Sequence, residues 1–306
     1  MLGTGSSGLI ESSQSHEEYS ITTTNKIINT IDVRITSVGG FTDRRVVVTL
    51  AVIAVLVIAG AVVAAMFLKN MPKDINSVDD LKGSNIAVQK GSTADDYVTD
   101  HYETNNSADV IRFIDFEVIF KDLEGKKVDA VIMDKAPAKV YLKNHSGLRI
   151  LSDVLQNEDY GFIFNNTNTE LRDKFNAKLT EMKDDGKLDE IKEYWYTHGD
   201  GAAAFITENG TGETIRVVTD SSFPPYDSKN GNEFTGMDMD IVREICNRLD
   251  YKVQFATVGF DSIIDEVSKG NYDVGASALS ITEDRKAKVL FSECYESSEL
   301  IIVTRA

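Results

Sequence analysis

Four stretches of this sequence combine charged, hydroxyl and aromatic side chains in a way that suits a small ligand. In the first, residues 219–227 (TDSSFPPYD), Asp220 follows an apolar run and two prolines follow Phe223. Open α/β sheets bind ligands beyond the carboxyl ends of their strands, and the prolines remove backbone freedom behind the ring. The stretch therefore predicts a ligand contact. A turn whose amides bond to Asp220, beside an ordinary core phenylalanine, is the alternative.

The second stretch, SALSITEDR, ends in an arginine. A strand is expected to end near Ser277, and Thr282 is a suitable N-cap for the short helix that follows. Arg285 falls in the first turn of that helix, where a cation opposes the helix dipole. A guanidinium is explained at this position if it clamps an anion, because it offers paired donors to a carboxylate. An ion pair with Glu283 or Asp284 is the alternative.

Two further stretches lie in the first half of the chain. Residues 89–93 (QKGST) join a strand to a helix start, whose N–H groups can meet an anion; a plain N-cap is the simpler explanation of these residues alone. Asp134 ends a strand before a helix, so it can cap that helix, bind an ammonium group, or do both. The four stretches together predict a site for a zwitterionic amino acid. The residues assigned to it are Arg285 and Thr93 for the carboxylate, Asp134 for the ammonium group, and Asp220, Phe223 and Phe260 for the side chain.

The sequence gives less support to an enzyme active site, a metal site or a nucleic-acid-binding surface. None of the four histidines forms an HExxH motif or a nucleophile–base signature with a nearby serine or cysteine. Cys246 and Cys294 form no CxxC pair, and their pairing is left open. We therefore predict no enzyme activity, no metal and no cofactor. The net charge of −17 argues against a nucleic-acid partner, because an acidic surface repels the phosphate backbone.

The elements that must position these side chains alternate between short strands and helices. Strand-like runs such as 110–114 and 128–132 alternate with helical patterns, and the alternation restarts at Thr214. This pattern is typical of βαβ units around a largely parallel sheet. Residues 115–133 and 261–278 both predict a helix, a glycine and an aspartate that opens a strand. We expect an α/β protein of two similar lobes with a ligand cleft between them.

Three other kinds of segment flank or connect the lobes. Val46 to Leu68 carries no charge and is long enough to cross a bilayer, which predicts a retained anchor. Cleavage within the small residues 61–65 is the alternative. Basic residues balance at the two ends, so charge does not set the orientation. The full division is a flexible tail at 1–45, a transmembrane helix at 46–68, an α/β lobe at 73–166, terminal helices at 167–197, a linker at 198–213 and a second α/β lobe at 214–306.

Several of these stretches resemble a known family. Residues 214–304 contain TDSSFPPY, FTGMDMDIV, GFDSIIDEVSKGNYDV, SALSITEDRKAKVLFS and YESSELIIV. Residues 75–197 contain SVDDLKGSNIAVQKGST, KKVDAVIMD, EDYGFIF and KLDEIKEYW. The first set is similar to the first lobe, and the second set to the second lobe and terminal helices, of the solute-binding proteins of amino-acid ABC transporters. The likeness covers about 210 of the 306 residues and implies the two-lobed type II periplasmic binding fold.

The resemblance also implies a role for each site residue. In the second half of the chain, Asp220 faces the ligand side chain, Phe223 and Phe260 sandwich it, Ser277 and Ser280 offer polar contacts, and Arg285 holds the α-carboxylate. In the first half, Gln89 and Thr93 line the opposite wall and Asp134 takes the α-ammonium group. Asp220 favours a basic or amide side chain, as in arginine, lysine, histidine or glutamine. Ala278 has no hydroxyl where some members of the family do, so the ligand itself stays open.

The function implied is that of an amino-acid receptor on the outer side of the cell membrane. Such a receptor closes its hinge on the ligand and delivers it to the permease of an ABC importer, with no bond made or broken. Two alternatives are an enzyme of the same fold, similar to cyclohexadienyl dehydratases, and a ligand-sensing input domain.

The order of the two lobes departs from the family. The lobe that contains TDSSFPPY comes first there and last here, which indicates a permuted order. A permuted chain predicts that residue 306 meets residues 69–73 at the hinge. A fragment of a tandem array of binding domains and a lobe-swapped dimer are the alternatives.

Overall fold

The computed structural model describes residues 44–69 and 71–306, with side chains at 49–63 and from 71 onward. The chain divides into two compact units, Met1–Met71 and Pro72–Ala306. The tail expected at 1–45 lies outside the described residues apart from its last two, which begin a helix.

That helix, α2 (Arg44–Lys69), encloses the range predicted for the anchor. Valine, alanine, leucine and isoleucine make up most of it. Within the residues that the structure describes, no helix is both long and apolar enough to span a membrane.

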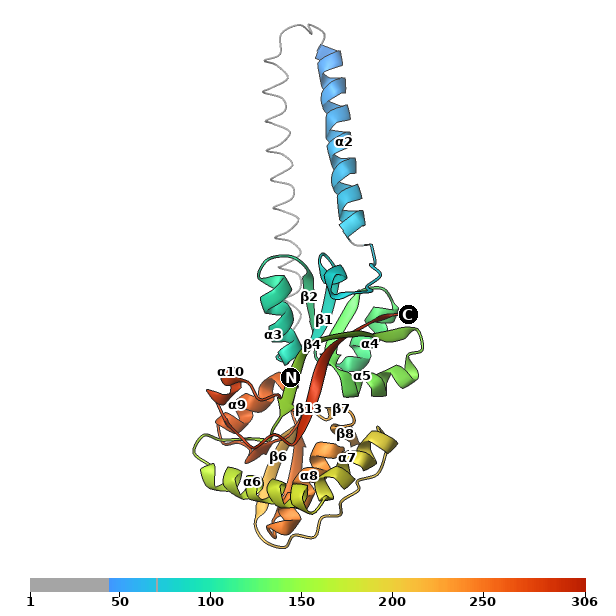
Figure 1. Ribbon diagram of the computed structural model, residues 1–306. Helices are drawn as coiled ribbons and strands as arrows, with labels where there is room; N and C mark the ends of the chain where they lie inside the picture. The colour runs from blue at the N-terminus through green and yellow to red at the C-terminus, as the bar shows by residue number, and fades with distance from the viewer. Residues whose placement is uncertain (1–43, 70) are drawn as a thin grey trace, which may run out of the picture. The chain divides into compact units, whose positions relative to one another are not determined.

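The unit Pro72–Ala306 is built on two five-stranded sheets (Figure 1). In the first sheet the strand order is β2-β1-β3-β13-β4. Strand β1 is parallel to β2 and β3, whereas β13 is antiparallel to both its neighbours. Apolar runs such as that of β3 are buried, as expected of strands covered on both faces. The strands are β1 (Asn85–Gln89), β2 (Asp109–Phe113), β3 (Ala130–Asp134), β4 (Leu148–Tyr160) and β13 (Glu296–Arg305).

The second sheet repeats this plan, with the order β10-β6-β11-β5-β12. Strand β6 is parallel to β10 and β11, and β5 is antiparallel to β11 and β12. The order β10-β6-β11 in the second sheet matches β2-β1-β3 in the first, and in both sheets an antiparallel strand from the other half of the chain follows. The strands are β5 (Ile163–Phe164), β6 (Thr214–Thr219), β10 (Lys252–Thr257), β11 (Val274–Gly275) and β12 (Leu290–Phe291).

The two lobes therefore exchange strands across the hinge. Strand β13 comes from the range 214–306 but completes the first sheet, and β5 comes from the range 73–166 but completes the second. The chain crosses between the sheets after β4 and again before β13. The lobes that the structure forms differ from the predicted ranges by one strand each, because a hinge made of two crossing strands requires this exchange.

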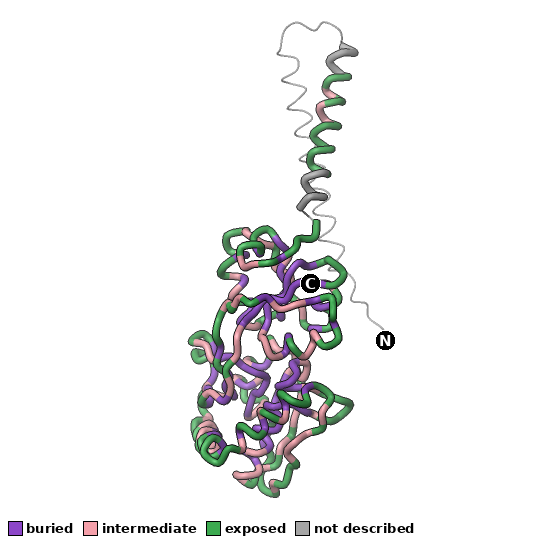
Figure 2. The backbone as a smooth tube through the Cα atoms, turned by 45° about the vertical axis from the view of Figure 1, so that its right-hand side comes forward, coloured by how far each residue is buried: buried purple, intermediate pink, exposed green. Residues whose placement is uncertain are grey.

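Helices cover the sheets and bury apolar side chains against them. Leu171, Phe175, Leu179 and Met182 of α6 all lie in the core. Figure 2 shows buried residues concentrated in the interior of the unit Pro72–Ala306 and exposed residues along its outer turns. The helices are α3 (Thr93–Val98), α4 (Phe116–Glu124), α5 (Lys135–Tyr141), α6 (Thr169–Asp184), α7 (Lys187–His198), α8 (Met237–Arg248), α9 (Ile263–Ser268) and α10 (Glu283–Lys286), and a small third sheet comprises β7 (Ser222–Phe223), β8 (Asp227–Asn230) and β9 (Glu233–Thr235).

The repeated glycine and aspartate pattern has the same structural role in both lobes. Asp129 accepts a hydrogen bond from the backbone N–H of Asn85, at the start of β1, at 3.0 Å. Asp273 accepts one from the backbone N–H of Arg216, near the start of β6, at 2.8 Å. Each carboxylate thus ties the entry of one central strand to that of its neighbour, which confirms that the two halves echo each other.

The predicted linker contains no regular secondary structure from 199 to 213, yet α8 holds it in place. The Asp240 carboxylate accepts from the backbone N–H of Phe205 at 2.8 Å. Beyond the end of α8, Asp250 accepts from the backbone N–H of Thr211, also at 2.8 Å. The composition predicted the absence of helix and strand, but these hydrogen bonds make the segment a fixed part of its lobe.

The C-terminus meets the start of the first lobe, as the permuted order predicts, but away from the hinge. The Arg305 guanidinium donates to the backbone oxygen of Lys73, and the Ala306 N–H donates to Gly147. Strand β13 pairs with β4 from Tyr160, next to the hinge, to Leu148 at the other end. Ten residues of β13 run the length of the sheet and carry the terminus to its outer edge.

Candidate functional site

The predicted residues Gln89 and Asp220 join the two lobes directly. Gln89 ends β1 and Asp220 follows β6, so both lie at the carboxyl end of a central strand. The Gln89 amide donates to the Asp220 carboxylate at 2.9 Å, and the Ser222 hydroxyl donates to the same oxygen at 2.7 Å. Burial raises the pKa of Asp220, and these two donors oppose that rise. The carboxylate therefore occupies a polar contact between the lobes.

Arg285 is buried in the first turn of α10, which Thr282 caps as predicted. Its guanidinium donates to two backbone oxygens, that of Ser280 at 3.0 Å and that of Gly91 in the other lobe at 3.2 Å. An ion pair between Arg285 and Glu283 was the alternative. It is wrong, because Glu283 pairs with Lys286. Among the described residues, no carboxylate forms an ion pair with Arg285. Burial lowers the pKa of this group, and nearby acids oppose that effect.

Asp134 ends β3 at the N-cap position of α5, but its side chain makes no capping hydrogen bond. Instead it accepts a hydrogen bond from the Tyr160 hydroxyl on β4. Burial, and next the neighbouring Glu158, hold the pKa of Asp134 well above its ordinary value. The Asp134 side chain is therefore bonded to β4 rather than to its own helix.

Glu158 is a buried acid among these residues that the sequence did not single out. It is buried on β4 opposite Ser298 of β13, and its carboxylate accepts from the Ser280 hydroxyl of the other lobe at 3.0 Å. It interacts electrostatically with both Asp134 and Arg285. The stretch EDYGFIF contains it, but only the position of β4 at the hinge turns this residue inward.

The two aromatic residues have different surroundings. Phe223 is buried against Phe116 of α4 in the other lobe, with ring centroids 5.4 Å apart, and 6.1 Å from the Tyr226 ring. Phe260, in the short 3₁₀ turn Phe260–Ser262, lies 5.7 Å from the Arg285 guanidinium. The sandwich of a ligand between Phe223 and Phe260 stays a prediction.

The remaining predicted residues, Thr93 and Ser277, are also buried. Thr93 is buried as the first residue of α3, behind the N-cap Ser92. Ser277 accepts from the backbone N–H of Asp220 at 3.3 Å and donates to Asp227 at 2.7 Å. Burial, followed by the charge of Asp220, raises the pKa of Asp227 to about 8. The wall behind Asp220 is therefore a buried, acidic network.

The lobes are closed on each other around these residues. Lys90 forms an ion pair of 2.9 Å with Asp261, and the Tyr141 hydroxyl donates to the backbone oxygen of Ser222 at 2.8 Å. Both contacts join one lobe to the other. Hence each side of the predicted cleft is positioned by groups of the opposite lobe.

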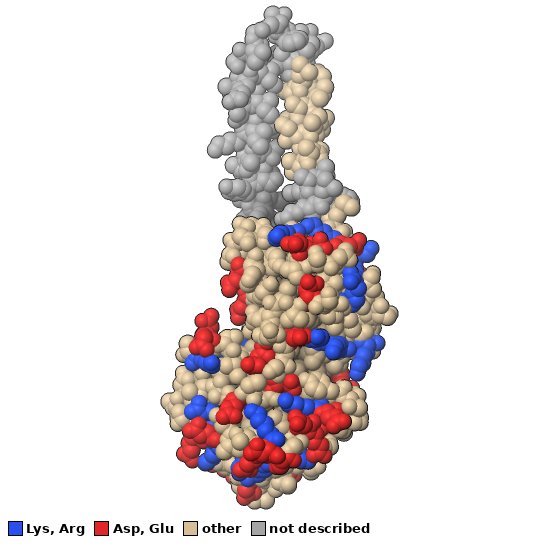
Figure 3. Space-filling model, viewed as in Figure 1, with Lys and Arg blue, Asp and Glu red and all other residues tan. Residues whose placement is uncertain are grey.

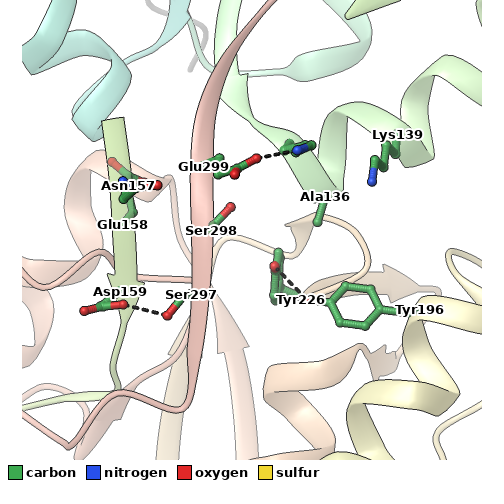
Figure 4. A pocket seen from close by; sticks show the side chains of 11 residues that line it. Ala136, Lys139, Asn157, Glu158, Asp159, Tyr196, Tyr226, Ser297, Ser298 and Glu299 are labelled. Carbon is green, nitrogen blue, oxygen red and sulfur yellow. Dashed lines mark hydrogen bonds and ion pairs between the residues drawn. The ribbon is translucent and has the colours of Figure 1, made fainter. Parts of the chain in front are cut away.

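A cavity of about 480 Å³ lies beside the hinge. None of the nine predicted residues lines it, but Glu158 does, together with residues of β13 and α5 (Figure 4). Tyr196 and Tyr226 close one side, with their hydroxyl oxygens 3.4 Å apart. The lining residues are Lys135, Ala136, Lys139, Asn157, Glu158, Asp159, Tyr196, Tyr226, Ser297, Ser298 and Glu299.

Outside this buried region, charge is mixed. Acidic and basic side chains are interspersed over the visible face of the unit Pro72–Ala306 (Figure 3).

Cys246 is buried and Cys294 partly buried, and both are free thiols. The described residues contain no cluster of histidine, cysteine and acidic side chains suited to a metal ion.

Comparison with known proteins gives similarities in both lobes. The sequence model of the bacterial extracellular solute-binding proteins, family 3, matches residues 81–198 and 215–306. The arginine-binding periplasmic protein of Mannheimia haemolytica is 33% identical over 90 residues, which cover 29% of this chain and 38% of that protein. The lysine/arginine/ornithine-binding periplasmic protein of Escherichia coli is 34% identical over 82 residues, 26% of this chain and 32% of that one.

A solved structure, an ancestral arginine-binding protein bound to arginine, is 37% identical over 24% of this chain and 34% of its own, with a TM-score of 0.24. The chain thus spans about a third of the length of each of these relatives. The family match, in contrast, extends over more than half of this chain, in both lobes. The chain belongs to the bacterial extracellular solute-binding proteins of family 3.

Proposed function

We propose that this protein is a receptor that binds a free amino acid between its two lobes and delivers it to an ABC importer. The members of its family are named as binding proteins, and the relatives above are named for arginine, lysine and ornithine. For that reason we prefer a binding protein to an enzyme of the same fold.

The buried guanidinium of Arg285 carries this proposal. A buried charge is costly unless an opposite charge pairs with it, and among the described residues the hydrogen-bond partners of Arg285 are neutral backbone oxygens. The α-carboxylate of an amino acid would supply the missing charge, with geometry that suits a guanidinium. One of those oxygens belongs to each lobe, so the guanidinium lies at the boundary between the lobes.

Acidic groups favour a basic ligand. Asp220 accepts from Gln89 across the lobe boundary, and a ligand ammonium or guanidinium group could replace that donor. Asp134 and Glu158 add two carboxyl groups near the opposite pole. In our proposal Asp220 faces the ligand side chain between Phe223 and Phe260, Asp134 takes the α-ammonium group, and Gln89, Thr93, Ser277 and Ser280 line the walls.

Hinge closure is the proposed mechanism. Two strand crossings, after β4 and before β13, connect the lobes and can bend while both sheets stay intact. A ligand that bonds to both lobes stabilises the closed form and so shifts the population toward it. No chemical step is required.

We also propose that residues 46–68 anchor the receptor on the outer side of the cell membrane and that the two lobes occur in permuted order. The absence of charged residues from 46 to 68 supports the anchor. The contact between Arg305 and Lys73 supports the permuted order, because it brings together the two points that the family order would connect. Release of the whole chain by alkaline carbonate from membranes would count against the anchor.

Calorimetry of the full chain with a panel of amino acids tests the function. Arginine, lysine or histidine should bind, and Arg285→Ala should abolish the binding, because a buried ligand carboxylate would lose its counter-charge. Arg172→Ala removes an arginine that pairs with its neighbour Asp173 on α6 and serves as the matched control. No heat with any amino acid, or unchanged affinity in Arg285→Ala, would contradict the proposal.

A further inference from the structure

We propose that Phe116 and Tyr141 form an aromatic latch, which holds the closed form together from outside the ligand site and slows the release of a bound amino acid. The proposal rests on the receptor function above, because the latch acts on a ligand only by keeping the lobes closed. Both residues are positioning residues, since neither belongs to the set predicted to contact the ligand.

The latch is built into the core of the first lobe. Phe116 is the first residue of α4, whose N-cap Asp115 accepts from the backbone N–H of Glu117 at 2.7 Å. Tyr141 is the last residue of α5. Its ring centroid lies 5.7 Å from that of Phe116 and 5.1 Å from that of Phe120, and both phenylalanines are buried. The two latch side chains are therefore held by their own lobe.

Both latch residues contact the same strand of the other lobe. The ring centroid of Phe116 lies 5.4 Å from that of Phe223, and the Tyr141 hydroxyl donates to the backbone oxygen of Ser222 at 2.8 Å. Ser222 and Phe223 form β7. Burial, the largest cause, raises the pKa of Tyr141, so its hydroxyl keeps the proton that it donates. One aromatic contact and one hydrogen bond thus meet at neighbouring residues.

The strand that receives the latch is held within its own lobe as well. The Phe223 N–H donates to the buried Asp227 carboxylate at 3.1 Å, and the Phe223 ring centroid lies 6.1 Å from that of Tyr226, with the two ring planes 25° apart. Pro224 and Pro225 restrict the backbone that follows. Because each side of the contact is fixed to its own lobe, opening of the hinge must pull the two sides apart.

Opening is unfavourable at this contact. Phe116 is 2% exposed and Phe223 is 6% exposed, and separation of the lobes would expose the face that each ring turns to the other. The Tyr141 hydroxyl would also leave the oxygen of Ser222 to water. Exposure of apolar surface and loss of an aromatic pair both disfavour the open form. The latch therefore stabilises the closed form without a bond to the ligand.

The latch differs in this respect from contacts made by the predicted site residues. Gln89 bonds to Asp220 across the lobe boundary, and in the proposed function both residues also serve the ligand. The latch should instead contribute the same free energy of closure whichever amino acid is bound. It should act on the rate of opening, which limits release. Association begins from the open form and should not change.

Tyr141→Phe removes the latch hydroxyl and keeps the ring. Release of radiolabelled L-arginine from the full chain, chased with unlabelled arginine, should become about fivefold faster, and Kd from calorimetry should rise by the same factor. The association rate constant, which is the ratio of the release rate to Kd, should stay unchanged. A second amino acid that binds, L-lysine or L-histidine, should show the same factor.

Tyr194→Phe is the matched control. The Tyr194 hydroxyl also donates to a backbone oxygen, that of Ala203 at 3.0 Å, but this contact lies within one lobe. The control should release arginine at the parent rate. Phe116→Leu is the second test variant, because it keeps an apolar side chain in the core and removes the ring that faces Phe223. It should also speed release by about fivefold, and thermal unfolding checks that each variant is folded.

Faster release with unchanged association, by the same factor for each bound amino acid, supports the latch. A factor that differs between two bound amino acids overturns it, because the residue would then contact the ligand. Release at the parent rate in both folded variants also overturns it and leaves the receptor function intact. If L-arginine, L-lysine and L-histidine all fail to bind to the parent, the receptor function itself is contradicted, and the latch with it.

Discussion

Asp227 is the buried acid whose titration has the clearest effect on stability. Its carboxylate accepts from the backbone N–H of Phe223 and from Ser277. Burial raises its pKa from 3.8 to about 8, so the folded protein binds this proton more tightly than the unfolded chain does. The resulting stability is fully present below about pH 4 and is lost as the pH rises toward 8.

Asp227→Asn should remove this dependence on pH. The amide oxygen can still accept from Phe223, and the amide has no proton to lose. We expect the parent to lose on the order of a few kcal/mol of unfolding free energy between pH 5 and 8 through this group, and the variant to lose much less. Urea unfolding at several pH values measures the difference. Asp265→Asn, on the exposed side of α9, should follow the parent, and a parent-like slope in Asp227→Asn would refute the assignment.

The loop between β1 and α3 contacts the other lobe at Arg285 and Asp261. Gly91 adopts φ +74° there and offers its backbone oxygen to Arg285. A Cβ atom at this position would lie 3.0 Å from the Cβ atom of Asp261 in the other lobe. The glycine thus has two roles, one in the turn itself and one in the closed contact.

Gly91→Ala and Gly186→Ala separate these roles. Gly186 adopts φ +80° with nothing near its missing Cβ atom, so alanine there adds only the backbone strain of about 1 kcal/mol. Both variants should unfold a few degrees below the parent. Only Gly91→Ala should also weaken ligand binding, by roughly tenfold, because closure brings its methyl group against Asp261. Thermal unfolding and calorimetry supply the two readouts, and equal affinities in the two variants would argue against a closure contact.

At the scale of the molecule, the order in which the chain connects the two lobes can be changed while the packing of each lobe is kept. Arg305 bonds to the backbone of Lys73 and to Asp129, so the C-terminus and the start of the first lobe already lie together. Gly199 follows the last residue of α7, where a cut disrupts neither a helix nor a strand.

A chain that runs from 199 to 306 and then, through a short glycine and serine joint, from 72 to 198 restores the family order. It should fold, melt within about 5 °C of the parent body 72–306, and bind the same amino acids, because every described contact within the lobes is retained. The same two fragments expressed together without the joint control for the cut. If the joined chain fails to fold while the uncut body folds, the contact at Lys73 does not mark equivalent ends.

Local patterns in the sequence predicted the elements whose form depends on near neighbours. The helix expected within 115–133 is α4, and Thr282 caps its helix as predicted. Both echoed aspartates open strands in their lobes. Helix periodicity and capping depend on residues a few positions apart, so they can be recognised in short stretches of the sequence.

Only the tertiary structure decided the features that depend on distant partners. Strand β4 was not predicted, because its alternating polar residues become a strand through pairing with β13, more than a hundred residues later. That same pairing exchanges strands between the lobes and places Glu158 opposite Ser298, where it accepts a hydrogen bond from Ser280 of the other lobe. The sequence predicts the residue types of an amino-acid site, whereas the burial of Glu158 beside the hinge could not be predicted from it. Burial and the approach of like charges are properties of the folded chain, set by which strands lie side by side.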